Sequence, residues 1–123
     1  MGWKFSNDKP IFAQIIDQVE LMIISGQYVL GDRLLSVRDM ATEAGVNPNT
    51  MQKALTELEK KGLLLTNRTN GKFITDDQEL VQQIRAEKAV KYIAQLLKNM
   101  HSLGYGKKEI QEIFNKQMEE LGA

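Results

Sequence analysis

The chain of 123 residues contains no cysteine, one histidine and two prolines. Without cysteine, a disulfide framework and every thiolate metal site are excluded. A single histidine, His101, falls short of the ligand set of a histidine-based zinc site. We therefore expect no bound metal and no other cofactor. The lack of cysteine also fits a reducing cytosol, so we expect a cytoplasmic protein.

Long hydrophobic runs are also lacking, since no stretch approaches the roughly 18 consecutive apolar residues of a membrane span. The N-terminal sequence "MGWKFSNDKP" is polar and has no signal-peptide core. Hydrophobic residues make up 42% of the chain and charged residues 26%, which is typical of an ordinary folded protein. We expect one compact unit, or a small domain with an extension, and no membrane partner.

Neither sign of charge is in excess, because 16 basic residues balance 16 acidic ones. The distribution is nevertheless uneven. Residues 47–75 hold five basic and two acidic residues, a net charge of +3, whereas residues 76–123 hold seven basic and eight acidic residues, a net charge of −1. Positive charge is therefore concentrated in the middle of the chain, where it would attract an anionic partner.

Three segments in the first half have the apolar spacing and the boundary residues of short helices. The first spans about residues 10–25. The second follows the N-cap Ser36 and ends at Gly45. The third follows the N-cap Asn47 and ends at Gly62. Because so short a turn joins the second and third helices, both must share one core with the first, and the segments predict a helix-turn-helix.

After the third helix the apolar period changes to that of strands. Residues 63–66 and 72–75 are short β-favouring runs, and the "NRTNG" between them contains an Asn-Gly turn signal. A short strand at residues 33–35 is also expected. The layout predicts an α+β, mainly helical fold with a winged helix-turn-helix DNA-binding domain over residues 1–75.

The remainder, residues 76–123, is predicted to be a short helical dimerisation domain. Residues 80–100 contain no proline or glycine, and their apolar residues recur almost as a heptad seam. A second amphipathic helix is predicted over about residues 107–121. The residues expected at the homodimer interface are Ala86, Ala89, Val90, Ile93, Leu96, Leu97 and Met100.

A homodimer is expected because one winged helix makes few base contacts, and specificity usually comes from two copies on a two-fold site. Packing against the last helix accounts for part of the seam. A small-molecule effector stays open, since the tail alone is too small to enclose an ordinary pocket of about 300 Å³ or more. A pocket at the dimer junction could be lined by Tyr92, His101 and Tyr105, although packing or a surface position explains each of them more simply.

The third helix presents a polar face opposite its apolar residues. In a helix-turn-helix this helix enters the major groove with its first turns nearest the bases. Asn49 and Gln52 could pair bidentately with adenine, because an amide offers a donor and an acceptor together. Lys53 could reach a guanine edge or a phosphate, and Thr50 suits a phosphate oxygen or a thymine methyl. The simpler interpretation is that the asparagines and Thr50 only cap and solubilise a surface helix.

Cations elsewhere in the motif support the DNA interpretation. Arg68, in the predicted hairpin, could enter a minor groove or lie along the backbone, and Lys72 could bind phosphate. Arg38 lies off the apolar stripe at the start of the second helix, where it could contact DNA or pair with a neighbouring carboxylate. Ser36 could donate its hydroxyl to a phosphate, but its role as an N-cap explains it equally well.

Four motifs follow one another along the first 75 residues. They are "PIFAQI" at 10–15, "GDRLLSVRDMATEAGVNPNTMQKAL" at 31–55, "LEKKGLL" at 58–64 and "RTNGKFIT" at 68–75. In this order they resemble the winged-helix domain of GntR-type bacterial transcription regulators. The short tail is similar to the YtrA subgroup, because larger subgroups carry a far longer effector domain. The resemblance implies a DNA-binding regulator, in this subgroup a repressor, although no residue favours repressor over activator.

The resemblance also assigns roles to residues of this sequence. Arg38 matches the family arginine that contacts DNA, and Gly71 matches the wing glycine that lets the hairpin tip approach the minor groove. Leu35 replaces a usual proline, and Thr69 and Asn70 replace a usual Gly-Lys pair, so the exact wing contacts stay open. The family's contacts from the recognition helix fall on Asn47, Asn49, Thr50 and Gln52.

Two other classes of protein fit the chain less well. An enzyme would need clustered titratable groups in a cleft, whereas the acidic residues here are scattered and no nucleophile or phosphate-loop motif is present. The winged-helix scaffold also serves as a protein-protein adaptor without DNA binding. An adaptor predicts an apolar or acidic face on the third helix, and the polar to basic face favours a double-stranded DNA operator as partner.

Overall fold

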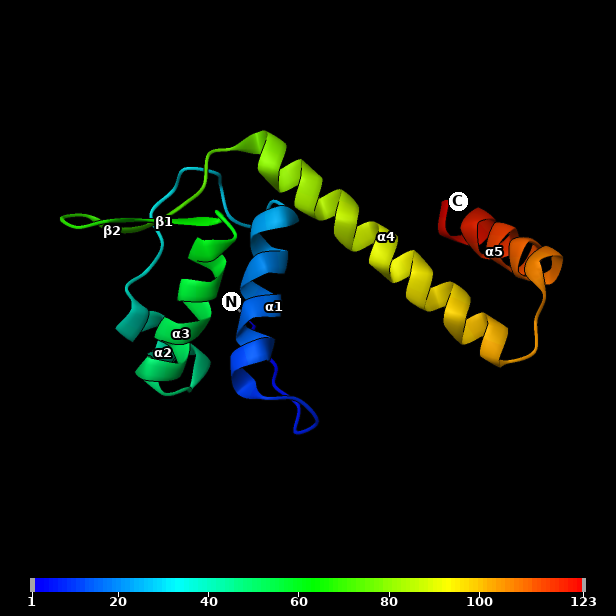
Figure 1. The fold of residues 1–123 in the computed structure, drawn as a ribbon, viewed down its shortest axis with the longest axis horizontal. Coiled ribbons are helices and arrows are strands. Elements are labelled where there is room, and N and C mark those ends of the chain that lie inside the picture. The colour runs from blue at the N-terminus through cyan, green and yellow to red at the C-terminus, as the bar shows by residue number, and fades with distance from the viewer. Residues whose placement is uncertain (1, 123) are drawn as a thin grey trace. The chain divides into compact units, whose positions relative to one another are not determined.

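The computed structural model describes residues 2–122, which form five helices and one two-stranded antiparallel sheet (Figure 1). Internal contacts divide the chain into two compact units, Met1–Arg85 and Ala86–Ala123. In chain order the elements are α1 (Ile11–Ile24), α2 (Val37–Ala44), α3 (Pro48–Lys60), β1 (Leu64–Asn67), β2 (Gly71–Ile74), α4 (Gln78–Ser102) and α5 (Lys107–Gly122).

The division between the two units falls within α4, beyond the boundary at residue 75 that the change of sequence pattern suggested. Val81 is buried in the core of the N-terminal unit and Ile84 packs against that core. The first turns of α4 therefore belong to the N-terminal unit by packing. The functional division into a DNA-binding domain (residues 1–75) and a dimerisation domain (residues 76–123) stays a prediction.

The short helices α2 and α3 begin and end through local hydrogen bonds. The Ser36 hydroxyl accepts a hydrogen bond from the Asp39 backbone N–H at 3.1 Å, and the Asn47 side chain accepts one from the Asn49 N–H at 2.8 Å. Gly45 ends α2 in the left-handed conformation, with φ at +69°, which costs glycine little. The predicted helix-turn-helix is thus confirmed to within two residues at each boundary.

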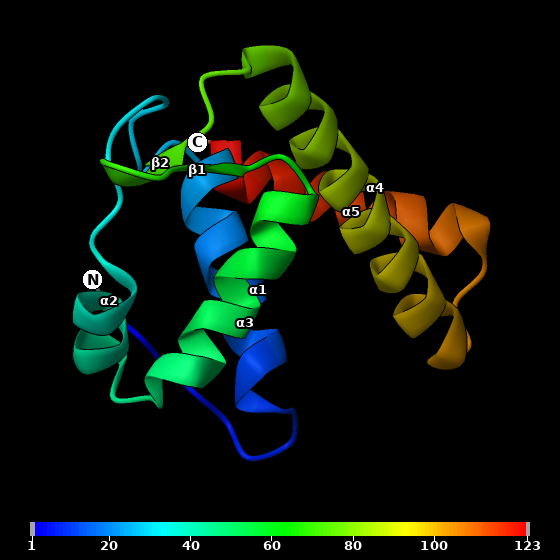
Figure 2. The ribbon, with the colours of Figure 1, turned by 60° about the vertical axis from the view of Figure 1, so that its left-hand side comes forward.

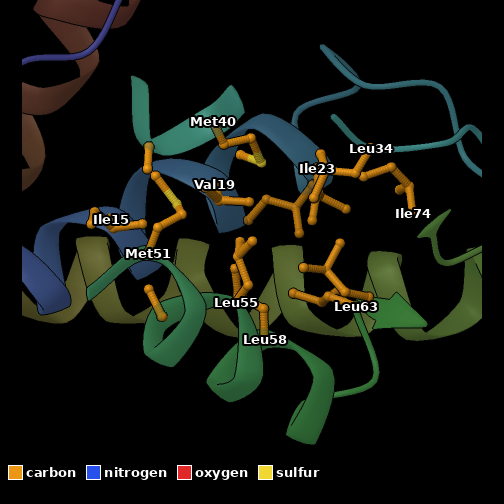
Figure 3. Packing of buried hydrophobic residues seen from close by; sticks show 14 of the residues in the cluster. Ile15, Val19, Ile23, Leu34, Met40, Met51, Leu55, Leu58, Leu63 and Ile74 are labelled. Atoms are coloured by element: carbon orange, nitrogen blue, oxygen red, sulfur yellow. The ribbon is translucent and has the colours of Figure 1, made fainter. Parts of the chain in front are cut away.

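The core of the N-terminal unit lies between α1 and α3, which run side by side (Figures 1 and 2). Ile15 and Val19 of α1 face Met51 and Leu55 of α3, and all four side chains are fully buried (Figure 3). Each such side chain contributes about 1.5–3 kcal/mol by leaving water. Burial of this row leaves the opposite side of α3 exposed.

The wing is the hairpin of β1 and β2, which pair from Leu64 with Ile74 to Asn67 with Gly71. Each strand differs from its predicted bounds by one residue. Strand β1 begins and ends one residue later than the predicted 63–66, and β2 begins and ends one residue earlier than the predicted 72–75. Leu63 precedes the strand because its N–H donates to the Leu58 carbonyl and completes the end of α3. The short strand expected at residues 33–35 is reduced to one antiparallel bridge between Arg33 and Phe73.

The segment before α1 packs on that helix through contacts that the sequence did not reveal. Trp3 and Phe5 stack with ring centroids 6.0 Å apart and lie against the core. Gln18 exchanges two hydrogen bonds with the Lys4 backbone, and the buried Gln14 donates to the Ser6 carbonyl. Within residues 2–122, no helix combines the length and the apolar character needed to cross a membrane.

Candidate nucleic-acid interface

The exposed side of α3 begins at its N-terminal turn. Asn47 is engaged as the N-cap, while the Asn49 side chain is exposed and takes part in no hydrogen bond within the described residues. Thr50 is half-buried at the same turn. The predicted residues therefore divide into Asn47, which holds the helix end, and Asn49, whose amide is available to a partner.

One turn further along α3, Gln52 and Lys53 are both exposed. The Gln52 amide donates to the Thr56 hydroxyl at 3.1 Å, so a base would have to replace that hydrogen bond. Lys53 forms no ion pair or hydrogen bond with any described side chain. This stretch of α3 thus offers one adaptable amide and one free ammonium group.

Arg38 occupies the first turn of α2, immediately after the Ser36 cap. Its side chain is exposed and has no hydrogen-bond or ion-pair partner among residues 2–122. The carboxylates on the same short helix, Asp39 and Glu43, do not pair with it in this structure. Arg38 is therefore free to bind an external anion without first breaking an internal contact.

The tip of the wing is shaped by hydrogen bonds within its turn. The Asn67 side chain accepts hydrogen bonds from the Thr69 N–H at 3.0 Å and from the Thr69 hydroxyl at 2.9 Å. Gly71 has a φ of +89°, a conformation that other residues rarely adopt. Arg68 is exposed at this turn and has no partner within the described chain. The hairpin accordingly presents a free guanidinium group.

Lys72 differs from the other predicted cations because it is anchored internally. Its ammonium group pairs with the Glu59 carboxylate of α3 and donates to the Thr66 hydroxyl at 3.1 Å, and its side chain is only 12% exposed. Partial burial alone would raise the pKa of Glu59, but hydrogen bonds from Lys72 and Thr66 outweigh it and lower this pKa. Lys72 thus links the wing to α3.

The cations counted in the net charge of residues 47–75 fall into two groups, those that form ion pairs within the fold and those that do not. Lys60 pairs with Glu57 at 3.1 Å, and Lys61 pairs with the buried Glu20 at 2.7 Å. With Lys72, three of the five cations in residues 47–75 already have a carboxylate partner. The basic side chains of the motif without a partner in the described chain are Arg33, Arg38, Lys53 and Arg68.

Arg33 was not among the predicted site residues. It lines a groove of about 310 Å³ between the start of α2 and the wing. The groove also brings together Ser36, Arg68, Gly71 and Lys72, four residues that the sequence analysis did predict. The short strand expected at residues 33–35 could have indicated that Arg33 lies beside the wing, because a strand needs a partner and the hairpin offers one.

The C-terminal unit has no fully buried side chain among residues 86–122. Val90 is 68% exposed and Leu121 is 81% exposed. Helices α4 and α5 enclose a groove of about 880 Å³. Its apolar lining residues are Ile93, Leu96, Leu97, Met100, Ile110, Ile113 and Phe114. Helix α5 therefore leaves the apolar seam of α4 largely uncovered within one chain.

The groove of the C-terminal unit contains only part of the predicted dimerisation set. Four members lie in it, whereas Ala86, Ala89 and Val90 lie outside its lining. Of the aromatic and histidine side chains considered for an effector pocket, His101 lines the groove and Tyr92 and Tyr105 do not. In the described residues, no cluster of three or more His, Cys, Asp or Glu side chains could hold a metal ion.

Three helices followed by a two-stranded wing define a winged helix-turn-helix protein. Residues 12–74 match the family model of bacterial regulatory proteins of the gntR family. The chain therefore belongs to the GntR family of transcriptional regulators. Its function is the regulation of transcription rather than catalysis.

Two relatives from Bacillus subtilis illustrate the extent of the similarity. The chain is 36% identical over 112 residues to the HTH-type transcriptional regulator YhcF, covering 91% of this chain and 93% of the relative. It is 43% identical over 68 residues to the HTH-type transcriptional repressor YtrA, a match that covers 55% of this chain and 52% of the relative. Similarity to YhcF thus extends through both units.

Solved structures share the fold. A GntR-family regulator from Listeria monocytogenes superposes with a TM-score of 0.84 at 37% identity, covering 91% of this chain and 98% of that one. A GntR-family factor from Sulfolobus acidocaldarius, YtrA, reaches a TM-score of 0.57 at 23% identity. The DNA-binding domain of AraR, solved in complex with operator ORX1, has a TM-score of 0.56 at 21% identity.

Proposed function

We propose that the protein is a sequence-specific repressor that binds a two-fold operator as a homodimer. In each copy α3 lies in the major groove and the wing lies at the minor groove. The observation that carries this proposal is the set of exposed cations without internal partners on α2, α3 and the wing. A folded domain that needed these charges for its own stability would pair them, as it pairs Lys60, Lys61 and Lys72.

The proposed contacts divide by chemistry. Asn49 and Gln52 read base edges, because their exposed amides combine a donor with an acceptor. The remaining members contact phosphates or approach the minor groove: Ser36, Arg38, Asn47, Thr50, Lys53, Arg68, Gly71 and Lys72. The complex of the AraR DNA-binding domain with its operator supports this use of the fold.

The proposed dimer forms through the C-terminal unit. Large apolar side chains exposed on both α4 and α5 would stay in water in a lone chain, and such surfaces usually mark an interface. A second copy supplies the same apolar groove, as a two-fold interface requires. We propose that the interface includes Ala86, Ala89, Val90, Ile93, Leu96, Leu97 and Met100. Two recognition helices would then meet half-sites about 34–36 Å apart or a multiple of that spacing.

Repression is the proposed outcome of binding, in line with the name of the relative YtrA. A dimer that covers a promoter would exclude the polymerase without any further activity. The test is a reporter gene whose promoter overlaps a site enriched from a random duplex pool. Expression of the regulator should lower reporter output, and a rise would establish an activator instead.

DNA binding itself is tested by fluorescence anisotropy with a random duplex over a series of salt concentrations. Affinity should fall steeply as salt rises, because each phosphate contact releases counterions. Sedimentation of the free protein in the same buffers should give the mass of a dimer. Binding that is absent or insensitive to salt would favour the alternative of a protein-protein adaptor.

A further inference from the structure

A short segment before α2 is joined to the wing by its backbone. The Leu34 N–H donates to the Lys72 carbonyl at 2.8 Å, and the Ile74 N–H donates to the Asp32 carbonyl at 2.8 Å. Between these hydrogen bonds, Arg33 is bridged to Phe73 in antiparallel register. Residues 32–34 thus pair with β2 along the edge of the hairpin. Backbone hydrogen bonds therefore set the position of Arg33 relative to the wing.

The side chain of Arg33 lies along Gly71. A Cβ atom at Gly71 would be 3.6 Å from Nη2 and 3.7 Å from Nε of Arg33. Arg33 is diagonal to Gly71 across the bridge, where side chains on one face of paired strands can meet. Its guanidinium group is exposed and has no carboxylate or hydrogen-bond partner in residues 2–122. The charge therefore lies beside the wing and is not neutralised within the described residues.

The groove around Arg33 has the electrostatic character of an anion site. Its lining includes three basic side chains, those of Arg33, Arg68 and Lys72, and no acidic side chain. Glu59 offsets the charge of Lys72, so the two arginines supply the uncompensated charge. Ser36 adds a hydroxyl group at the side of the groove formed by the start of α2.

We propose that Arg33 binds a phosphate of the DNA backbone in this groove, a contact that rests on the proposed function and extends it. A guanidinium group can hold two phosphate oxygens at once. Arg33 lies beside Gly71 of the wing and not on α3, the helix proposed to meet the base edges, so the DNA backbone is the contact that suits it. Phosphate contacts of this kind set the register of a protein on the duplex and carry no sequence preference.

The test compares Arg33→Gln with wild type by anisotropy, on a random duplex and on a duplex enriched from a random pool. The variant keeps a polar side chain of similar length but loses the charge. Affinity should fall about tenfold for each lost contact, and so about 100-fold for the dimer, on both duplexes. Because the proposed dimer would lose one contact in each copy, the slope of log K against log salt should become shallower by about 1.8, the value for two phosphates. Arg33→Lys should keep the wild-type slope, because the charge remains, with a smaller loss of affinity.

Arg85→Gln is the matched control, since Arg85 is an exposed arginine on α4 outside the groove. It should retain wild-type affinity and slope. An equal loss for Arg85→Gln, an unchanged slope for Arg33→Gln, or a loss confined to the enriched duplex would overturn the phosphate contact. Thermal unfolding of each variant should match wild type because neither arginine is buried.

The two proposals fail in different ways. If wild-type protein shows no salt-dependent DNA binding, the proposed function is wrong and the contact falls with it. If wild type binds with a steep salt slope and Arg33→Gln binds equally well, only the assignment of Arg33 is wrong.

Discussion

The N-terminal unit buries a core of apolar side chains, whereas no side chain of the C-terminal unit is buried among residues 86–122. Leu55 and Ile15 are fully inaccessible to water. By contrast, Leu97 and Phe114 are 46% and 38% exposed although they line the same groove. The N-terminal unit therefore completes its own core, and the C-terminal unit requires another surface to bury its apolar residues. This difference supports the proposed division of tasks, with DNA contact in the first unit and association in the second.

Among substitutions that test this difference between the units, the largest effect is expected from a charge placed in the groove of the C-terminal unit. Leu96→Glu should convert the proposed dimer to a monomer, because a carboxylate would have to enter an apolar interface. Operator affinity should fall by about 10²–10⁴-fold as the linkage between two half-sites is lost. Sedimentation and anisotropy measure the two effects. Gln95→Glu adds the same charge at an adjacent exposed position outside the groove lining, and it should leave both unchanged.

A second substitution tests the N-terminal unit by removing volume from its buried core. Leu55→Ala should lower the free energy of unfolding by about 2–5 kcal/mol, since a fully buried leucine leaves a cavity. Urea unfolding can be followed through Trp3, the only tryptophan, which packs against the core. The loss should not depend on protein concentration. A concentration-dependent loss would mean that this core also relies on the association of two chains.

A third prediction sharpens the contrast between free and paired cations within the N-terminal unit. Arg38→Ala should weaken DNA binding by about 1.5–3 kcal/mol for each half-site, because a charge-assisted contact is removed there, while the melting temperature stays near that of wild type. Lys60→Ala is the control, since Lys60 is already paired with Glu57, and it should reduce affinity less. A comparable loss of folding stability in Arg38→Ala would show that Arg38 is structural.

Gln52 tests base reading by the same unit. Gln52→Ala should change the preference at one base position by about 1–3 kcal/mol, because a bidentate amide contact is lost. Selection from a randomised duplex pool, carried out in parallel on variant and wild type, measures the preference. Identical motifs from both selections would show that Gln52 does not read a base.

The smallest effect is expected at the link between the wing and α3. Lys72→Met should lower the free energy of unfolding by less than about 1 kcal/mol at neutral pH, since the ion pair with Glu59 is only partly buried. The folded-state pKa of Glu59 is lowered, so its contribution is present above its unfolded pKa and is lost as pH falls through the folded value. The difference between variant and wild type should therefore shrink in acid. A difference that persists unchanged in acid would point to packing of the lysine stem instead.

Local rules explain why the helix-turn-helix could be predicted closely. Ser36 and Asn47 cap the helices that follow them, and Gly45 ends α2, each through hydrogen bonds or dihedral angles within a few residues. The register of the wing was less accessible, because the start of β1 depends on how α3 ends at Leu63. The winged helix-turn-helix and the GntR family follow from the sequence.

The sequence by itself determined the order of the elements, their caps and the apolar faces, because these properties depend on neighbours within one or two helical turns. Only the tertiary structure decided which cations are free. Lys61 meets Glu20 across 41 positions of sequence, and Lys72 meets Glu59 across 13. Arg33 lies on Gly71 because backbone hydrogen bonds join distant segments. Such contacts between distant residues decide whether a cation is paired within the fold or is available to bind a partner. Composition and periodicity do not specify them.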